Sequence, residues 1–261
     1  MKYLGGKHGI GKKIALFISQ KCPNNSVNGY IEPFCGSLGV FKQMTTKNYK
    51  IYIASDIQPD LIELWEKVQK NKLKLPNEIN EADYNKIKNS KSPNYMKAVA
   101  GFGLSFGGKY FAGYAQKSAG NSGRNFLQEF KNSMEKIKPL ISEKNVHFYN
   151  KSYLDYNPTN MLIYCDPPYK STEKYASTED FNHELFWETM RKWSRNNCVF
   201  ISEQTAPADF KSVWSLKKRR TLDKTSRFYN KEHLFVYAKT KQYITKKNKP
   251  TINKTRKNKK V

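Results

Sequence analysis

The stretch YIEPFCGSLGVFKQM, residues 30–44, decides the fold class. Its first five residues indicate a short buried strand, Gly36 and Gly39 provide a tight turn, and the apolar positions that follow predict a helix. A second strand is expected at 51–54, and Pro59 then occupies the first position of a helix with apolar residues three and four apart. Strand, glycine turn, helix, strand and helix predict an α/β domain with a parallel sheet.

The remainder of the chain resumes this alternation after an interruption. Residues 72–140 lose the regular pattern, and we expect an inserted, mostly helical segment there, with a long loop at 101–123. Beyond it, the apolar runs predict strands at 146–149, 161–165, 198–202 and 234–237 and a helix through 185–193. The chain should therefore divide into a core, residues 1–71 and 141–238, an insertion, residues 72–140, and a tail, residues 239–261.

The charge of the chain points to a polyanionic partner. Lys and Arg number 47 against 22 Asp and Glu, which gives a net charge of +25. Residues 239–261 hold ten of the basic residues and no acid, so the rest of the chain still carries about +15. Nucleic acid is the leading candidate partner. The alternative is a charged solubilising surface or a source rich in Lys and Asn, and the tail should be disordered unless it lies along phosphates.

The cysteines and histidines show no pattern of metal ligands. Cys22, Cys35, Cys165 and Cys198 are far apart in sequence, and none of the four histidines pairs with Cys or carboxylates at ligand spacing. We therefore expect reduced thiols in a cytosolic compartment, and no metal. Since no apolar run approaches the length of a membrane span, we also expect a soluble protein without a membrane partner.

The most specific motif is Asp166-Pro167-Pro168-Tyr169, which follows the apolar strand 161–165. Ligands of α/β sheets bind at the carboxyl ends of strands, although prolines at this place would also suit an ordinary turn. Asp166 and the Pro167 carbonyl could accept hydrogen bonds from the two N–H groups of a planar amine, which would free its nitrogen lone pair for attack. The Tyr169 ring offers a flat face for an unstacked base.

A second motif concerns a nucleotide-like cofactor. Asp56 follows Gly36 by 20 residues at the end of the next strand, which is the spacing of an acid that binds ribose hydroxyls. A plain tight turn is the alternative for the glycines alone. The N-terminal Gly5-Gly6-Lys7 could lie along a ligand, but by itself it favours an ordinary flexible terminus.

Together these segments resemble the Dam-type DNA adenine-N6 methyltransferases, the D12 class with the alpha-group order of motifs, over nearly the whole chain up to Lys239. The resemblance implies a Rossmann-like S-adenosyl-L-methionine-dependent methyltransferase sheet with one antiparallel strand, and residues 72–140 as a helical target-recognition insertion. It implies the catalytic residues Asp166, Pro167, Pro168 and Tyr169. It implies cofactor contacts from Tyr3, Gly6, Lys7, Glu32, Phe34, Gly36, Asp56, Ile57, Tyr153 and Asp166. The family usually has a second glycine two residues after the first, where this chain has Leu38.

The expected partner is double-stranded DNA with its target adenine flipped out. The loop at 101–124 supplies residue types that read phosphates and bases, namely Lys109, Tyr110, Tyr114, Gln116, Lys117, Asn121 and Arg124. In the family a hairpin near the C-terminus approaches the DNA backbone, which would place Arg219 and Arg227 there. Solvated loop positions are the alternative for each of these residues. We expect a monomer in the cytoplasm of a bacterial cell or a phage-infected host.

Two other functions share the same motifs. The acceptor pair suits any planar amine or amide, so methylation of RNA adenine or of a protein glutamine is the first alternative. An inactive DNA-binding relative is the second, although the motif 166–169 is intact. Gly36 and Asp166 are 130 residues apart, which leaves room for a recognition insertion and favours DNA.

Overall fold

The computed structural model describes residues 1–117, 123–143, 145–169, 181–219 and 229–240. The strands are β1 (Gly29–Glu32), β2 (Tyr52–Asp56), β3 (Val146–Asn150), β4 (Met161–Cys165), β5 (Cys198–Glu203), β6 (Phe210–Arg219) and β7 (Tyr229–Tyr237). The helices are α1 (Gly11–Lys21), α2 (Phe41–Met44), α3 (Pro59–Gln69), α4 (Glu81–Asn89), α5 (Tyr95–Ala98), α6 (Phe126–Ile141) and α7 (His183–Trp193). A π-helical turn at Val99–Gly103 continues α5, and short 3₁₀ turns lie at Asn24–Ser26, Thr45–Lys47, Phe106–Gly108, Ala115–Lys117 and Tyr153–Asp155.

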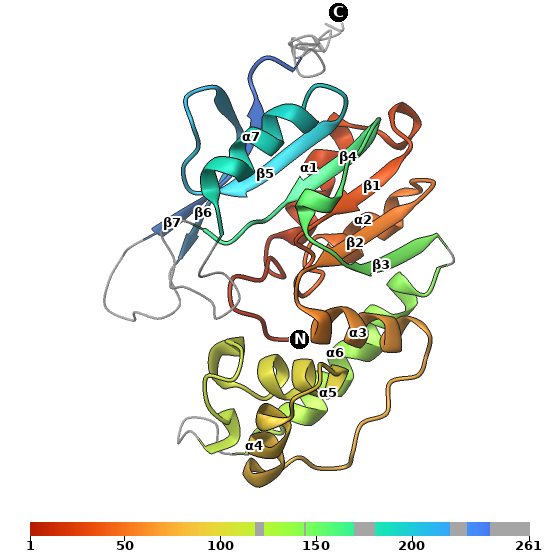
Figure 1. The fold of residues 1–261 in the computed structure, drawn as a ribbon, viewed down its shortest axis with the longest axis vertical. Coiled ribbons are helices and arrows are strands. Elements are labelled where there is room, and N and C mark those ends of the chain that lie inside the picture. The colour runs from red at the N-terminus through yellow and green to blue at the C-terminus, as the bar shows by residue number, and fades with distance from the viewer. Residues whose placement is uncertain (118–122, 144, 170–180, 220–228, 241–261) are drawn as a thin grey trace, which may run out of the picture.

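The strands form a seven-stranded sheet in the order β3-β2-β1-β4-β5-β7-β6 (Figure 1). The first five strands of this order are parallel, and β7 is antiparallel to both of its neighbours, β5 and β6. The Rossmann-like α/β sheet and its single antiparallel strand are confirmed. Every residue of β1, β4 and β5 is buried, as expected for central parallel strands that are covered on both faces.

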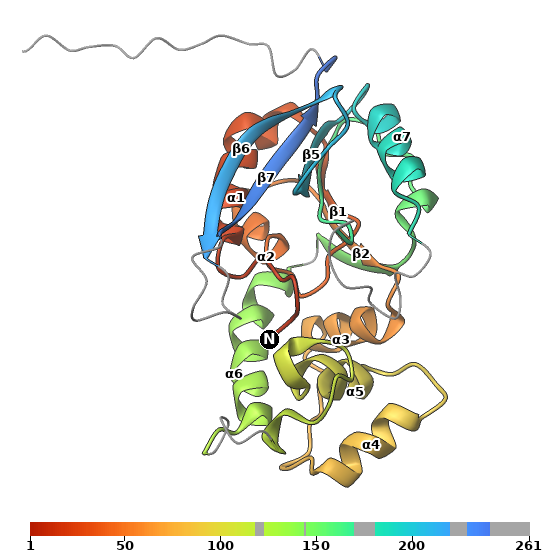
Figure 2. The same ribbon diagram turned by 90° about the vertical axis from the view of Figure 1, so that its left-hand side faces the viewer.

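Two apolar layers cover the sheet. On one face, α1, α2 and α3 pack against side chains such as Tyr30, Leu162 and Phe200. On the other face, Phe186 and Met190 of α7 pack against the intervening residues of the same strands. Figure 2 shows α1 and α2 opposite α7 across the sheet. Successive residues of one strand point to opposite faces, so each central strand contributes side chains to both apolar layers.

Helices α4, α5 and α6 lie together at one end of the sheet, beside α3 (Figure 1). Each begins at an asparagine whose side chain accepts a backbone N–H of the first turn, and Asn80 forms a full capping box with Asp83. The N-terminal segment runs between this helical group and the sheet, since Leu4 N–H donates to the Gly108 carbonyl over 3.1 Å. These contacts set the N-terminal loop against the segment 101–117.

Strand β6 was missing from the sequence prediction. Phe210 packs in one apolar layer and Trp214 and Leu216 pack in the other, because the register with β7 shifts between Ser212 and Trp214. Such a bulge adds one residue and breaks the period of two that identifies a strand. The edge strand of the sheet is therefore visible only once its pairing with β7 is known.

The expectation of four reduced cysteines is wrong for one pair. Cys22 and Cys198 form a disulfide with their Cα atoms 6.5 Å apart, although 176 residues separate them in sequence. The pair arises because the C-terminal end of α1 packs beside the start of β5, a tertiary contact that spacing does not reveal. Cys35 and Cys165 are buried and unpaired. Within the described ranges, no helix is long and apolar enough to cross a membrane.

Candidate active site

The carboxyl ends of β2, β1 and β4 meet at one edge of the sheet, because these strands are adjacent and parallel. Glu32 ends β1, Asp56 ends β2, and Asp166 follows β4. A cavity of about 780 Å³ opens at this edge. All residues expected to bind the cofactor or to act in catalysis line this cavity: Tyr3, Gly6, Lys7, Glu32, Phe34, Gly36, Asp56, Ile57, Tyr153, Asp166, Pro167, Pro168 and Tyr169.

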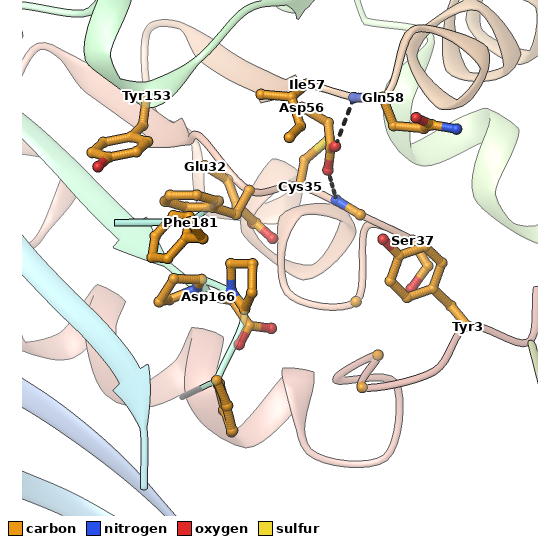
Figure 3. A pocket seen from close by; sticks show the side chains of 18 of the residues that line it. Tyr3, Glu32, Cys35, Ser37, Asp56, Ile57, Gln58, Tyr153, Asp166 and Phe181 are labelled. Atoms are coloured by element: carbon orange, nitrogen blue, oxygen red, sulfur yellow. Dashed lines mark hydrogen bonds between the residues drawn. The ribbon is translucent and has the colours of Figure 1, made fainter. Parts of the chain in front are cut away.

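Asp56 is held by the backbone around it. Its Oδ2 accepts the Gly36 N–H at 3.0 Å and its Oδ1 accepts the Gln58 N–H at 3.1 Å, as Figure 3 shows. Burial raises the pKa of Asp56, while the N–H groups of Gln58, Gly36 and Ile57 oppose that rise. The carboxylate thus joins the glycine turn after β1 to the start of α3, and it lines the cavity.

Asp166 lies in a buried charged cluster. Its Oδ1 is 2.9 Å from Lys7 Nζ, and Lys7 Nζ donates to the Tyr169 hydroxyl at 2.7 Å. That hydroxyl donates to Glu232 of β7, whose Oε1 is also 3.5 Å from Lys7 Nζ. Burial raises the pKa of Asp166 to about 6; the Lys7 ammonium opposes this rise, and the Glu232 carboxylate adds to it. Burial lowers the pKa of Lys7, but Asp166 and Glu232 outweigh it, so the net shift is upward.

Aromatic side chains form one wall of the cavity. Phe34 and Tyr153 have ring centroids 5.2 Å apart, and Phe181 lies 6.0 Å from Phe34 (Figure 3). Sequence reasoning missed Phe181. It directly precedes Asn182, the N-cap of α7, and packs on Phe186 five residues further on, with centroids 5.6 Å apart. An apolar residue before an N-cap and another at the fourth helical position form a hydrophobic staple, which is a signal readable from sequence.

The sequence matches the model of the D12 class N6 adenine-specific DNA methyltransferase family over residues 3–103 and 105–234. The chain belongs to this family. The match includes the glycine turn, the segment 166–169 and the strand that carries Glu232. Membership makes the protein a methyltransferase and implies S-adenosyl-L-methionine as its methyl donor.

Solved structures similar to this D12 methyltransferase are distant in sequence. A proposed RNA methyltransferase from Pyrococcus horikoshii is 10% identical with a TM-score of 0.38, and the match covers 88% of this chain and 84% of that one. A proposed methylase from Haemophilus influenzae is 12% identical with a TM-score of 0.34, covering 86% of each chain. No curated protein matches the sequence.

The structure explains how this D12 methyltransferase accommodates Leu38 where the family usually has a second glycine. Leu38 has φ = 58°, the left-handed region that a glycine would adopt without strain. That conformation costs a non-glycine residue about 1–2 kcal/mol. The side chain is fully buried, and burying a leucine contributes about 1.5–3 kcal/mol. Burial thus offsets the strain, so the loop keeps the shape that glycine would give it.

The residues that we expect to contact DNA differ in their hydrogen-bond partners and in their surroundings. Tyr110 lines the cavity and donates to Asp60 Oδ2 at 2.6 Å, and Tyr114 donates to the Ile79 carbonyl at 2.6 Å. Arg124 forms a two-bond ion pair with Glu129, and Gln116 donates to the Arg124 carbonyl. These four side chains thus contact neighbouring parts of the protein. Lys109, next to Tyr110, is half-buried. The DNA-binding role of all five residues stays a prediction.

The structure describes no side chain for four further predicted DNA contacts. Asn121 and Arg227 lie outside the described residues, and only the backbone is described for Lys117 and Arg219. Glu232 was not predicted, because β7 comes next to Lys7 and Tyr169 only by inserting between β5 and β6. No group of His, Cys, Asp or Glu in the described part of the chain could hold a metal ion.

Proposed function

We propose that this methyltransferase transfers the methyl group of S-adenosyl-L-methionine to N6 of adenine in double-stranded DNA, with the target base flipped out of the helix. The observation that carries the proposal is that the turn 166–169 lines the same cavity as Asp56 and the glycine turn after β1. A methyl acceptor held by the first would therefore face a donor held by the second. Base-modifying enzymes take their target out of the stack for this purpose.

The cavity fits the methyl donor in its polar groups and its shape. Ser37 Oγ is buried and has no hydrogen-bond partner among the described residues, so it is available to a ligand. A Cβ on Gly6 would lie 3.0 Å from that oxygen, and one on Gly36 would lie 3.3 Å from the Tyr3 ring. The two glycines thus leave room along the N-terminal loop. Asp56 would hold the ribose hydroxyls, and the wall of Phe34, Tyr153 and Phe181 would pack against the donor's adenine.

The donor, when bound, supplies a methyl group on a positively charged sulfur. The residues of the chain prepare the nucleophile. Asp166 and the Pro167 carbonyl would accept the two N–H bonds of the adenine amine, which draws the nitrogen toward tetrahedral geometry and frees its lone pair. Pro167 and Pro168 have no N–H that would compete for these acceptors, and Tyr169 would stack on the base.

Binding of DNA would involve the helical group α4–α6 and the edge strand β6. The segment 101–117 lies against the N-terminal loop that lines the cavity, so residues that read DNA there would be next to the flipped base. Lys211 and Lys217 of β6 are exposed and suit phosphates. We infer that residues 72–140 form the target-recognition insertion and that residues 1–71 and 141–238 form the catalytic domain.

Mass spectrometry of nucleosides tests the proposal. Duplex DNA is incubated with the protein and the methyl donor, then digested; N6-methyladenine is the expected product. Parallel incubations use RNA and a glutamine-containing peptide. Product in either of these with none in DNA would replace the proposed substrate, and no product in any arm would indicate an inactive relative. Asp166→Ala serves as the control for methylation by a contaminating enzyme.

A further inference from the structure

Glu232 is a largely buried carboxylate that contacts Lys7 and Tyr169 of the cavity wall, and the mechanism above does not use it. Its side chain is 11% exposed, and it comes from β7, far in sequence from the motif 166–169. It accepts the Tyr169 hydroxyl and lies 3.5 Å from Lys7 Nζ. Two carboxylates, Glu232 and Asp166, thus face one ammonium group.

Lys7 occupies contacts that the target amine needs. Its Nζ is 2.9 Å from Asp166 Oδ1 and lies above the Tyr169 ring, 4.6 Å from the ring centroid. An adenine amine bound by Asp166, with its base stacked on Tyr169, would compete with the ammonium for both. Lys7 is only 6% exposed, so it cannot move into water without rearrangement of the loop. A buried ammonium that is left without an anion is strongly unfavourable.

We propose that Glu232 is a positioning residue for methyl transfer, which holds the Lys7 ammonium when the target amine takes its place on Asp166. This inference rests on the proposed function. Glu232 is already within 3.5 Å of Lys7 Nζ, so a small movement of one side chain exchanges the partners. The Tyr169 hydroxyl, bonded to both Lys7 and Glu232, lies on the path between them. Asp166 would then offer its freed oxygen to the amine.

The charges around Asp166 give this role a signature in the pH dependence. The groups that face Asp166 are Lys7 of the N-terminal loop, Tyr169, Glu232 of β7 and Glu32 of β1, with Tyr164 of β4 beneath. Burial is the main cause that raises the pKa of Asp166, and Glu232 adds to it. Replacing Glu232 by glutamine removes that addition. The acid limb of kcat/KM, which reports groups of the free enzyme, should therefore move to lower pH.

Single-turnover methylation of duplex DNA by Glu232→Gln tests the proposal. We expect the rate at saturating DNA to fall at least tenfold, while the affinities for DNA and for S-adenosyl-L-homocysteine stay within twofold of wild type. Glu66→Gln is the matched control: it makes the same change at a Lys–Glu pair, Lys70 Nζ to Glu66 Oε2 at 2.9 Å, on the exposed surface of α3. A wild-type rate for Glu232→Gln, or an unchanged acid limb, would overturn the proposal.

A cycle with Lys7→Met shows whether Glu232 acts through Lys7. In the Lys7→Met background, Glu232→Gln should cost no further rate, because the ammonium it holds is absent. An equal tenfold loss in both backgrounds would contradict the proposal. Thermal unfolding followed by circular dichroism checks that each variant folds. Should Glu232→Gln not fold, Glu232→Asp takes its place in the same cycle. We then expect a loss of rate in the background that keeps Lys7 and no further loss in the Lys7→Met background.

The two proposals fail in different ways. Absence of N6-methyladenine with the wild-type protein would remove the proposed function. If the wild type methylates adenine and Glu232→Gln does so equally fast, the proposed function stands and the role of Glu232 is refuted.

Discussion

Replacing Asp166 by asparagine separates the charge of this side chain from its shape. The amide keeps one acceptor oxygen toward the target amine but loses the negative charge and gains two donors. In the protein this charge faces Lys7 Nζ at 2.9 Å, and Glu232 remains 3.5 Å from the same ammonium. The variant therefore changes the acceptor without leaving Lys7 unpaired.

The magnitudes follow from these contacts. Removing the acceptor altogether in Asp166→Ala should lower the rate by about 10²–10³, the scale of one transition-state hydrogen bond. A hydrogen bond to a charged group exceeds one between neutral groups by about 1–1.5 kcal/mol, so Asp166→Asn should lose roughly 5- to 15-fold. Breaking a buried ion pair costs about 3–5 kcal/mol when the remaining charge has no partner. Because Glu232 stays with Lys7, we expect a smaller loss of unfolding free energy, about 1–3 kcal/mol.

Single-turnover methylation of duplex DNA by wild type, Asp166→Asn and Asp166→Ala measures the rates, and chemical denaturation measures the stabilities. Asp209→Asn is the control: it removes one charge of an ion pair with Arg191, at 2.6 Å, outside the cavity. The expected order is wild type, then Asn, then Ala. A wild-type rate in Asp166→Ala would refute the assignment of the acceptor and with it the mechanism.

Four further predictions concern the cavity and the tail. The pKa of Asp166 is raised to about 6, chiefly by burial, so kcat/KM should fall as the pH drops through that value, because the protonated carboxyl loses an acceptor; a flat profile from about pH 5 to 8 would contradict this. Asp56→Ala should weaken binding of S-adenosyl-L-methionine by about 1–3 kcal/mol in calorimetry, and unchanged affinity would exclude the ribose contact. Tyr169→Ala should weaken capture of the flipped base by about 1–3 kcal/mol, while Tyr169→Phe keeps the stacking face and most of the rate. Removing residues 241–261 should flatten the salt dependence of DNA affinity without changing sequence preference. The truncation keeps Thr240, whose hydroxyl donates to the Ser194 carbonyl. Loss of sequence preference would mean that the tail reads the DNA.

Much of the site could be predicted because its parts are local. Asp166-Pro167-Pro168-Tyr169 directly follows a strand of five buried residues, and Gly36 lies between a strand and a helix. Parallel strands bring their carboxyl ends to one edge whatever the length of the insertion between them. The segment 101–124 was harder, because residue type alone does not distinguish a tyrosine that reads DNA from Tyr110, which is bonded to Asp60.

By itself, the sequence determined the α/β class, the strands of the parallel part and the two turns, after β1 and after β4, that line the cavity, because hydrophobic period and turn residues act over a few neighbours. Only the tertiary structure decided which side chains meet across the sheet. Glu232 reaches Lys7 because β7 inserts antiparallel between β5 and β6, and Cys22 meets Cys198 because α1 packs beside β5. Such pairings depend on strand order and on the packing of distant segments, and neither leaves a periodic trace in the residues that take part.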